Sequence, residues 1–165
     1  MGRCLVKKPI VLAGAAAAIL VGAAGWIMSR DSETETSTAP AVQDIAAGKV
    51  LYGEYCAVCH GVNLEGQPDW RSPGPDGRLP APPHDKDGHT WHHSDRILFD
   101  YTKRGGKVAL ADQGIELDSG MPGFGEILED AEIWNILAYI KSTWPERERL
   151  AQVERTAVDN ELGGN

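Results

Sequence analysis

The sequence predicts an all-α domain preceded by one transmembrane helix, and three observations support that fold class. Residues 9–29 contain no charged side chain, and about 20 such residues suffice for a helix to cross a bilayer. Apolar residues recur with helical spacing near the C-terminus, at positions 133, 136, 137 and 140. No segment shows the alternation expected of a strand. We divide the chain into an anchor at 1–29, a linker at 30–40, a folded domain at 41–144 and a charged tail at 145–165.

The composition excludes several classes of protein. A length of 165 residues fits one domain with short appendages, and three cysteines cannot form a disulfide framework. The net charge is −8, and all 24 acidic residues follow residue 29 together with 13 of the 16 basic ones. An acidic body of this kind lacks the basic surface expected of a nucleic-acid-binding protein. It also argues against attachment to anionic lipid by charge alone.

The apolar segment 9–29 predicts a membrane anchor or uncleaved signal. Trp26 lies near its end, where an indole prefers the membrane–water interface. Basic residues precede the segment and acidic residues follow it, so the positive-inside rule places the N-terminus in the cytoplasm and the remaining chain in the periplasm. The alternative is a cleaved signal peptide, with Gly22-Ala23-Ala24 as its cleavage site. The linker 30–40 lacks bulky apolar side chains and is typical of a flexible tether.

The first helix of the domain is expected over residues 41–55. Pro40 favours a helix start there, and Ser37 or Thr38 would cap it. Gly48 and Tyr52 lie four residues apart, so a small residue and an aromatic residue share one helix face. The segment 61–93 contains six prolines and is expected to be a long loop wrapped around a ligand.

Two more helices are expected after this loop. One covers 94–104, with Ser94 as its N-cap and Gly105-Gly106 as its end. The other runs from about Asp130, which would cap it, to Trp144 before Pro145. The tail 145–165 is charged and weakly patterned, which predicts a frayed helix or disorder.

One motif indicates the chemistry. Cys56-Ala57-Val58-Cys59-His60 is a C-x-x-C-H sequence, the attachment motif for c-type haem. Two thiols three positions apart on a helical turn reach one side of a porphyrin, and His60 directs an imidazole nitrogen at the iron. A zinc site would need further ligands, and no other cysteine follows residue 59. A thioredoxin-like dithiol would need a βαβ pattern, which the sequence lacks. We therefore expect one covalent haem c, held by Cys56 and Cys59.

Met121 is the candidate for the second axial ligand. It is the single methionine after residue 28 and stands in Ser119-Gly120-Met121-Pro122-Gly123-Phe124. A proline flanked by glycines suits a rigid turn that presents one side chain. A lone methionine is more often a core residue, but a haem with one histidine ligand favours a thioether on its other face.

Four of the five histidines lie in the loop 84–93. Interleaved with carboxylates, they could form a second metal site, for which His89, His92 and His93 are the candidates. The alternative is a solvated loop before the 94–104 helix, with Trp91 packed near the haem. Lys103, Arg104 and Lys107 form a basic cluster that would surround the haem edge or be an ordinary helix end.

These motifs together resemble class I c-type cytochromes, in particular bacterial membrane-anchored monohaem members. Gly48 and Tyr52 resemble that family's glycine–aromatic pair on its first helix, and Ile136 and Tyr139 its contacts on the last helix. The resemblance covers residues 41–144 and implies crossing N- and C-terminal helices and a short middle helix around the haem. It implies that a proline carbonyl, from Pro82 or Pro83, orients His60. Tyr52, Pro82, Trp91 and Tyr101 are the expected pocket residues.

The resemblance implies an electron-transfer protein and not an enzyme. The expected role is to carry single electrons between a quinol-oxidising cytochrome complex and a terminal oxidase, at the periplasmic face of the cytoplasmic membrane, without a small-molecule substrate. Three alternatives stay open: a fixed haem subunit of an oxidase or reductase complex, a metal-handling cytochrome that uses the loop 84–93, and a haem peroxidase. The peroxidase would require an absent or labile Met121.

Overall fold

The computed structural model describes residues 39–40 and 42–163, which belong to one compact unit, Thr36–Asn165. The segment 9–29 and residues 37–38 lie outside the described residues. The first helix begins at Ile45 and not at residue 41, and its cap is Asp44 in place of the expected Ser37 or Thr38, because the Asp44 carboxylate accepts from Ala46 N and Ala47 N at 2.9 Å. All regular structure in the described part is helical, which agrees with the all-α prediction. The helices are α2 (Ile45–Tyr55), α3 (Ala57–His60), the 3-10 helix η1 (Thr90–His92), α4 (Asp95–Arg104), α5 (Gly106–Ala111), α6 (Asp130–Ser142) and α7 (Glu146–Gly163). No helix in this part of the chain is long and apolar enough to span a membrane.

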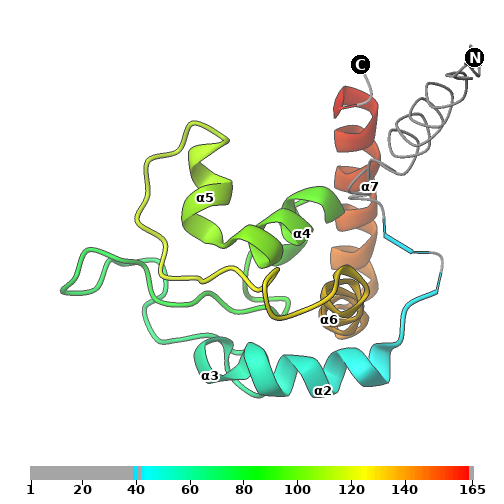
Figure 1. Ribbon diagram of the computed structural model, residues 1–165, viewed down its shortest axis with the longest axis horizontal. Coiled ribbons are helices and arrows are strands. Elements are labelled where there is room, and N and C mark those ends of the chain that lie inside the picture. The colour runs from blue at the N-terminus through cyan, green and yellow to red at the C-terminus, as the bar shows by residue number, and fades with distance from the viewer. Residues whose placement is uncertain (1–38, 41, 164–165) are drawn as a thin grey trace, which may run out of the picture. The chain divides into compact units, whose positions relative to one another are not determined.

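The first helix, α2, crosses α6 at very close range. Figure 1 shows α6 nearly end-on against α2. A Cβ built on Gly48 would lie 1.9 Å from the carbonyl oxygen of Asn135, so only glycine allows this approach. The Asn135 side chain accepts a hydrogen bond from Asp44 N at 2.8 Å, and Tyr52 packs on Tyr139 with 5.5 Å between ring centroids. The predicted crossing of the first and last family helices is therefore present.

The main apolar core is formed by the buried face of α6 and the residues packed against it. Ile133, Trp134, Ile136, Leu137 and Ile140 are all buried, and Trp134 stacks on Phe99 of α4 at 4.6 Å. The start of α6 differs from expectation, because Glu129 precedes the helix and its N–H is bonded by the Glu132 carboxylate at 2.9 Å. Asp130 is thus the first helical residue and not the cap.

The α4 helix begins and ends as the sequence predicts. Ser94 Oγ accepts from Ile97 N at 3.4 Å, and Gly105 ends the helix with a φ of 85°, a conformation that favours glycine. The chain then forms α5, which was not predicted, because Gly105-Gly106 turns the chain into a second short helix rather than ending helical structure.

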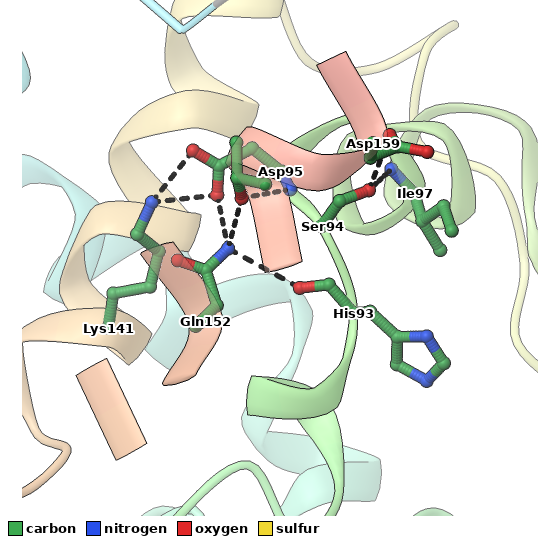
Figure 2. Close-up of polar contacts among 8 residues, drawn as sticks. His93, Ser94, Asp95, Ile97, Lys141, Gln152 and Asp159 are labelled. Atoms are coloured by element: carbon green, nitrogen blue, oxygen red, sulfur yellow. Dashed lines mark hydrogen bonds and ion pairs between the residues drawn. The ribbon is translucent and has the colours of Figure 1, made fainter. Parts of the chain in front are cut away.

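Of the two alternatives for the tail, the helix is present in its described part, and it is continuous where fraying was expected. Glu146–Gly163 is the continuous helix α7, and it contacts η1 and α4. Figure 2 shows why: Gln152, which is 1% exposed, donates from Nε2 to Asp95 Oδ1 at 2.7 Å, and Lys141 binds the same carboxylate at 2.7 Å. Asp159 accepts from Ser94 Oγ at 2.7 Å. Polar side chains hold α7 against the domain. The sequence therefore shows no apolar periodicity in this segment that would have predicted a packed helix.

Candidate functional site

The two thiols of the C-x-x-C-H motif lie at the junction of α2 and α3. Cys56 joins the two helices, and its carbonyl accepts hydrogen bonds from Cys59 N at 3.1 Å and His60 N at 3.0 Å. Both thiols are free; Cys56 is partly buried and Cys59 is exposed. Burial, and secondarily the nearby Cys59, raise the pKa of the Cys56 thiol to about 12. The turn thus holds two thiols and an imidazole within five consecutive residues.

The imidazole of His60 is held in one tautomer. Its Nδ1 lies 2.8 Å from the carbonyl oxygen of Pro82, and a carbonyl can only accept, so Nδ1 carries the proton and Nε2 keeps its lone pair. Burial lowers the pKa of His60, and the bond to Pro82 partly opposes that shift. Pro82, rather than Pro83, is therefore the proline that orients this ring.

The loop after the motif is tied to α2. Tyr52, which is 1% exposed, donates from its hydroxyl to the carbonyl of Gly61 at 3.0 Å. Burial is the largest cause that raises the pKa of this phenol. Tyr52, His60 and Pro82 are thus brought together on one side of the motif.

This donor set fits a covalently bound haem c. Such a haem needs two free thiols at C-x-x-C spacing and a neighbouring neutral histidine whose second nitrogen is bonded to the protein. Cys56, Cys59 and His60 satisfy these requirements in the structure. They would supply both thioether bonds and the proximal nitrogen ligand.

His84 belongs to the same group of residues, and the sequence analysis missed it. Its ring stacks on the ring of His60 with 4.0 Å between centroids and 27° between planes. Burial, then the neighbouring His60 and His89, lower its pKa well below the ordinary value for histidine. The sequence signal that could have identified His84 is its position directly after Pro82-Pro83, because one of these prolines was expected to contact His60.

Met121 is placed by the corner between α4 and α5. Its carbonyl accepts from Gly106 N at 3.1 Å, and its N–H lies 3.3 Å from Ser119 Oγ. A Cβ on Gly123 would meet the Arg104 carbonyl carbon at 2.7 Å, so glycine permits the loop to lie against this corner. The structure therefore fixes the backbone of Met121. The residues that bond Met121 lie near α5, whereas His60 is bonded by Pro82 of the loop 61–93.

Trp91 and Tyr101 lie among the loop histidines. Trp91 stacks on His92 at 3.7 Å and packs against the core, and its indole N–H donates to Lys86 O at 3.3 Å. Tyr101 stacks on His93 at 6.3 Å. The pKa of its phenol is raised, mainly by burial.

The three histidines proposed for a second metal do not form such a site. His89 stacks on Trp70 at 5.2 Å, His92 on Trp91 and His93 on Tyr101. Within the described residues, no group of three histidine, cysteine or carboxylate side chains is arranged to hold a metal ion. His89 and His93 meet edge to face with 5.4 Å between ring centroids, and His92 lies against Trp91 instead.

The basic cluster is neutralised by carboxylates. Lys103 pairs with Asp130 at 3.1 Å, Arg104 with Asp112 at 2.7 Å, and Lys107 with Asp118 at 3.3 Å. These pairs favour the interpretation of an ordinary helix end over that of a positive docking surface.

Comparisons with known proteins identify the family of this chain. A family model described as cytochrome c matches residues 45–144. Among curated proteins, the chain is similar to a thiosulfate dehydrogenase of Stutzerimonas stutzeri (strain A1501), with 33% identity over 119 residues. The match covers 70% of this chain and 33% of that protein, so the chain spans about a third of the length of the relative. No solved structure gives a significant match. With most of its folded domain matched, the chain belongs to the cytochrome c family, whose covalently bound haem c serves electron transfer.

Proposed function

We propose that this protein is a monohaem cytochrome c that carries single electrons between a quinol-oxidising complex and a terminal oxidase. The observation that carries the proposal is the hydrogen bond from His60 Nδ1 to Pro82 O. It leaves Nε2 available as an axial ligand beside two free thiols. Electron-transfer encounters of this kind are small and short-lived.

Met121 completes the proposed ligand set. Its backbone is fixed on both sides by Gly106 and Ser119, so its thioether is presented from a rigid loop. A bound haem c supplies reversible one-electron chemistry, and thioether ligation raises its potential. If His60 and Met121 both held the iron, no coordination site would remain for a substrate, and the protein would serve as a carrier.

A tether to the cytoplasmic membrane is part of the proposal. The uncharged segment 9–29, with basic residues before it and acidic residues after it, supports an anchor with the haem domain in the periplasm. Tethering raises the local concentration of the carrier near membrane-bound partners.

Haem attachment is the first test, and the chain supplies its own control. The full chain, produced with a haem-maturation system, should show covalent haem by mass and by the pyridine haemochrome spectrum. The double variant Cys56→Ala/Cys59→Ala should lose it, whereas Cys4→Ala should retain it. Covalent haem in the double variant would contradict the assignment.

The similarity to a thiosulfate dehydrogenase favours one second candidate, a role in thiosulfate oxidation. Direct chemistry would require a distal position that a ligand can enter. Thiosulfate added to the ferric protein would then reduce it rapidly, and cyanide would bind rapidly. The carrier proposal predicts slow cyanide binding and no reduction by thiosulfate alone.

A further inference from the structure

We propose that His84 is a positioning residue for the proximal ligand His60. The proposal rests on the proposed function, because it assumes that His60 binds the haem iron. Its basis is geometric: the two imidazoles lie nearly face to face, 4.0 Å apart. Among the loop histidines, His84 is the one that the structure stacks on the C-x-x-C-H motif.

The His84 ring is held from the side by Thr90. His84 Nδ1 and Thr90 Oγ1 are 2.8 Å apart, and Thr90 is 5% exposed. The Thr90 hydroxyl also lies 3.4 Å from Pro83 O. Because that carbonyl only accepts, the hydroxyl donates to it and accepts from His84. One hydroxyl thus fixes the tautomer and the plane of the second imidazole.

The backbone of His84 is fixed from two further elements. Its N–H donates to Leu64 O at 2.8 Å, and its carbonyl accepts from the indole N–H of Trp144, after α6, at 2.7 Å. Tyr52 of α2 meets the His84 ring edge-on at 6.1 Å. Leu64 and Trp144 thus hold the backbone of His84, while Thr90 and Tyr52 contact its ring, so the orientation of this imidazole is fixed.

The stacked His84 ring restrains His60 in addition to the hydrogen bond between His60 Nδ1 and Pro82 O. A single hydrogen bond at Nδ1 fixes the His60 tautomer but still allows the ring to rock about that contact. A stacked ring against its face blocks this motion. An aromatic face also attracts positive charge, and the ligand ring carries more of it when the iron is ferric. His84 therefore both fixes the ligand plane and favours the ferric form.

The test uses the full chain matured with haem, in five versions. They are the parent, His84→Leu, His84→Phe, Thr90→Val and the control His92→Leu, whose ring is exposed and stacks on Trp91. Two readouts report on the ligand: the midpoint potential, and the haem-methyl proton shifts of the ferric protein, which depend on the ligand plane. If His84 served packing alone, the midpoint potential and the haem-methyl shifts would not depend on whether residue 84 carries an aromatic ring.

The expected result is graded. His84→Leu raises the midpoint potential and alters the haem-methyl pattern, and His84→Phe, which keeps an aromatic face, stays closer to the parent. Thr90→Val alters the haem-methyl pattern because it frees the His84 ring, and it carries the test if His84→Leu does not fold. His92→Leu matches the parent.

Parent-like values in His84→Leu, or equal shifts in His84→Leu and His92→Leu, would overturn the inference. If His84→Leu does not fold, a parent-like haem-methyl pattern in Thr90→Val would overturn it. A failure of the proposed function is distinguishable, because the parent itself would then lack a low-spin spectrum with histidine ligation. In that case the inference falls with the function on which it rests.

Discussion

The two C-terminal helices, α6 and α7, pack against the rest of the domain through different kinds of contact. The α6 helix meets α2 through backbone and apolar surface, at a distance that excludes any side chain on Gly48. The α7 helix meets residues 93–96 through buried polar groups centred on Gln152. The match to the family ends at residue 144, between the two helices. A contact of the first kind is sensitive to added volume, whereas one of the second kind is sensitive to a changed donor or charge.

The largest expected effect breaks the α2–α6 crossing. Gly48→Val places a branched side chain where a Cβ alone would lie 1.9 Å from Asn135 O. Since neither helix backbone can yield, we expect the free energy of unfolding to fall by about 4 kcal/mol. Chemical denaturation followed by circular dichroism measures it.

Gly53→Ala is the matched control on the same helix. A Cβ on Gly53 meets nothing within 4 Å, so alanine should stabilise α2 by about 0.5–1 kcal/mol. Equal destabilisation by the two substitutions would mean that helix crossing is not the cause.

The next effect breaks the α7 contact. Gln152→Glu replaces a buried donor by a carboxylate that faces Asp95, and we expect a loss of about 3 kcal/mol at pH 7. The loss should shrink as the pH falls and the new carboxyl is protonated. Urea unfolding at several pH values measures both quantities. Glu154→Gln, on the exposed side of α7, is the control and should leave stability unchanged.

The same contrast explains what the sequence could predict. The spacing of Gly48 and Tyr52 predicted only a shared helix face, and their resemblance to the family's glycine–aromatic pair implied the α2–α6 crossing. Gln152 and Asp159 gave no such indication, because a polar residue on a helix is usually exposed. Their partners at 93–96 are more than 50 residues away in sequence, and no local pattern reports a contact of that range.

A third prediction sharpens the comparison through pH. His93 lies beside the α7 contact, and burial, then the charges of His89, His92 and Arg155, lower its pKa to about 4. Between pH 4 and about 6.5 the unfolded chain binds the proton that the folded state does not, so stability rises with pH in this range. The contribution is complete above pH 6.5 and is lost as the pH falls towards 4.

His93→Phe should flatten that dependence. Allowing for partial exposure of the ring, we expect the stability difference between pH 4.5 and 7 to decrease by about 1–2 kcal/mol. Urea unfolding of the parent and the variant at both pH values measures it. Parallel profiles would show that His93 does not titrate as the structure indicates.

The smallest effect concerns the ion pair at the far end of α7. Asp159 binds Arg96 at 2.7 Å and 2.9 Å and Ser94 at 2.7 Å, and Arg96, first, lowers the pKa of this carboxyl. Asp159→Asn should cost about 1 kcal/mol, because Arg96 is half exposed. Thermal unfolding of both variants measures this, and Asp87→Asn, which breaks the exposed pair with Lys86, should cost almost nothing.

The site shows a similar division between local and distant information. The C-x-x-C-H motif is local, so the sequence identified Cys56, Cys59 and His60 together, and the structure places them on one turn. His84 and Thr90 support His60 only because the loop 61–93 folds back on itself. The crowding of His89, His92 and His93 is also local, but in the described residues these side chains are not arranged to hold a metal ion, and sequence proximity alone could not predict how their rings are oriented.

The most direct test of the central claim is the midpoint potential of the haem-loaded full chain beside its Met121→Ala variant. The account predicts a clearly positive potential in the parent that falls in the variant, since a thioether ligand favours the ferrous state. A low potential that the substitution leaves unmoved would contradict His60/Met121 ligation.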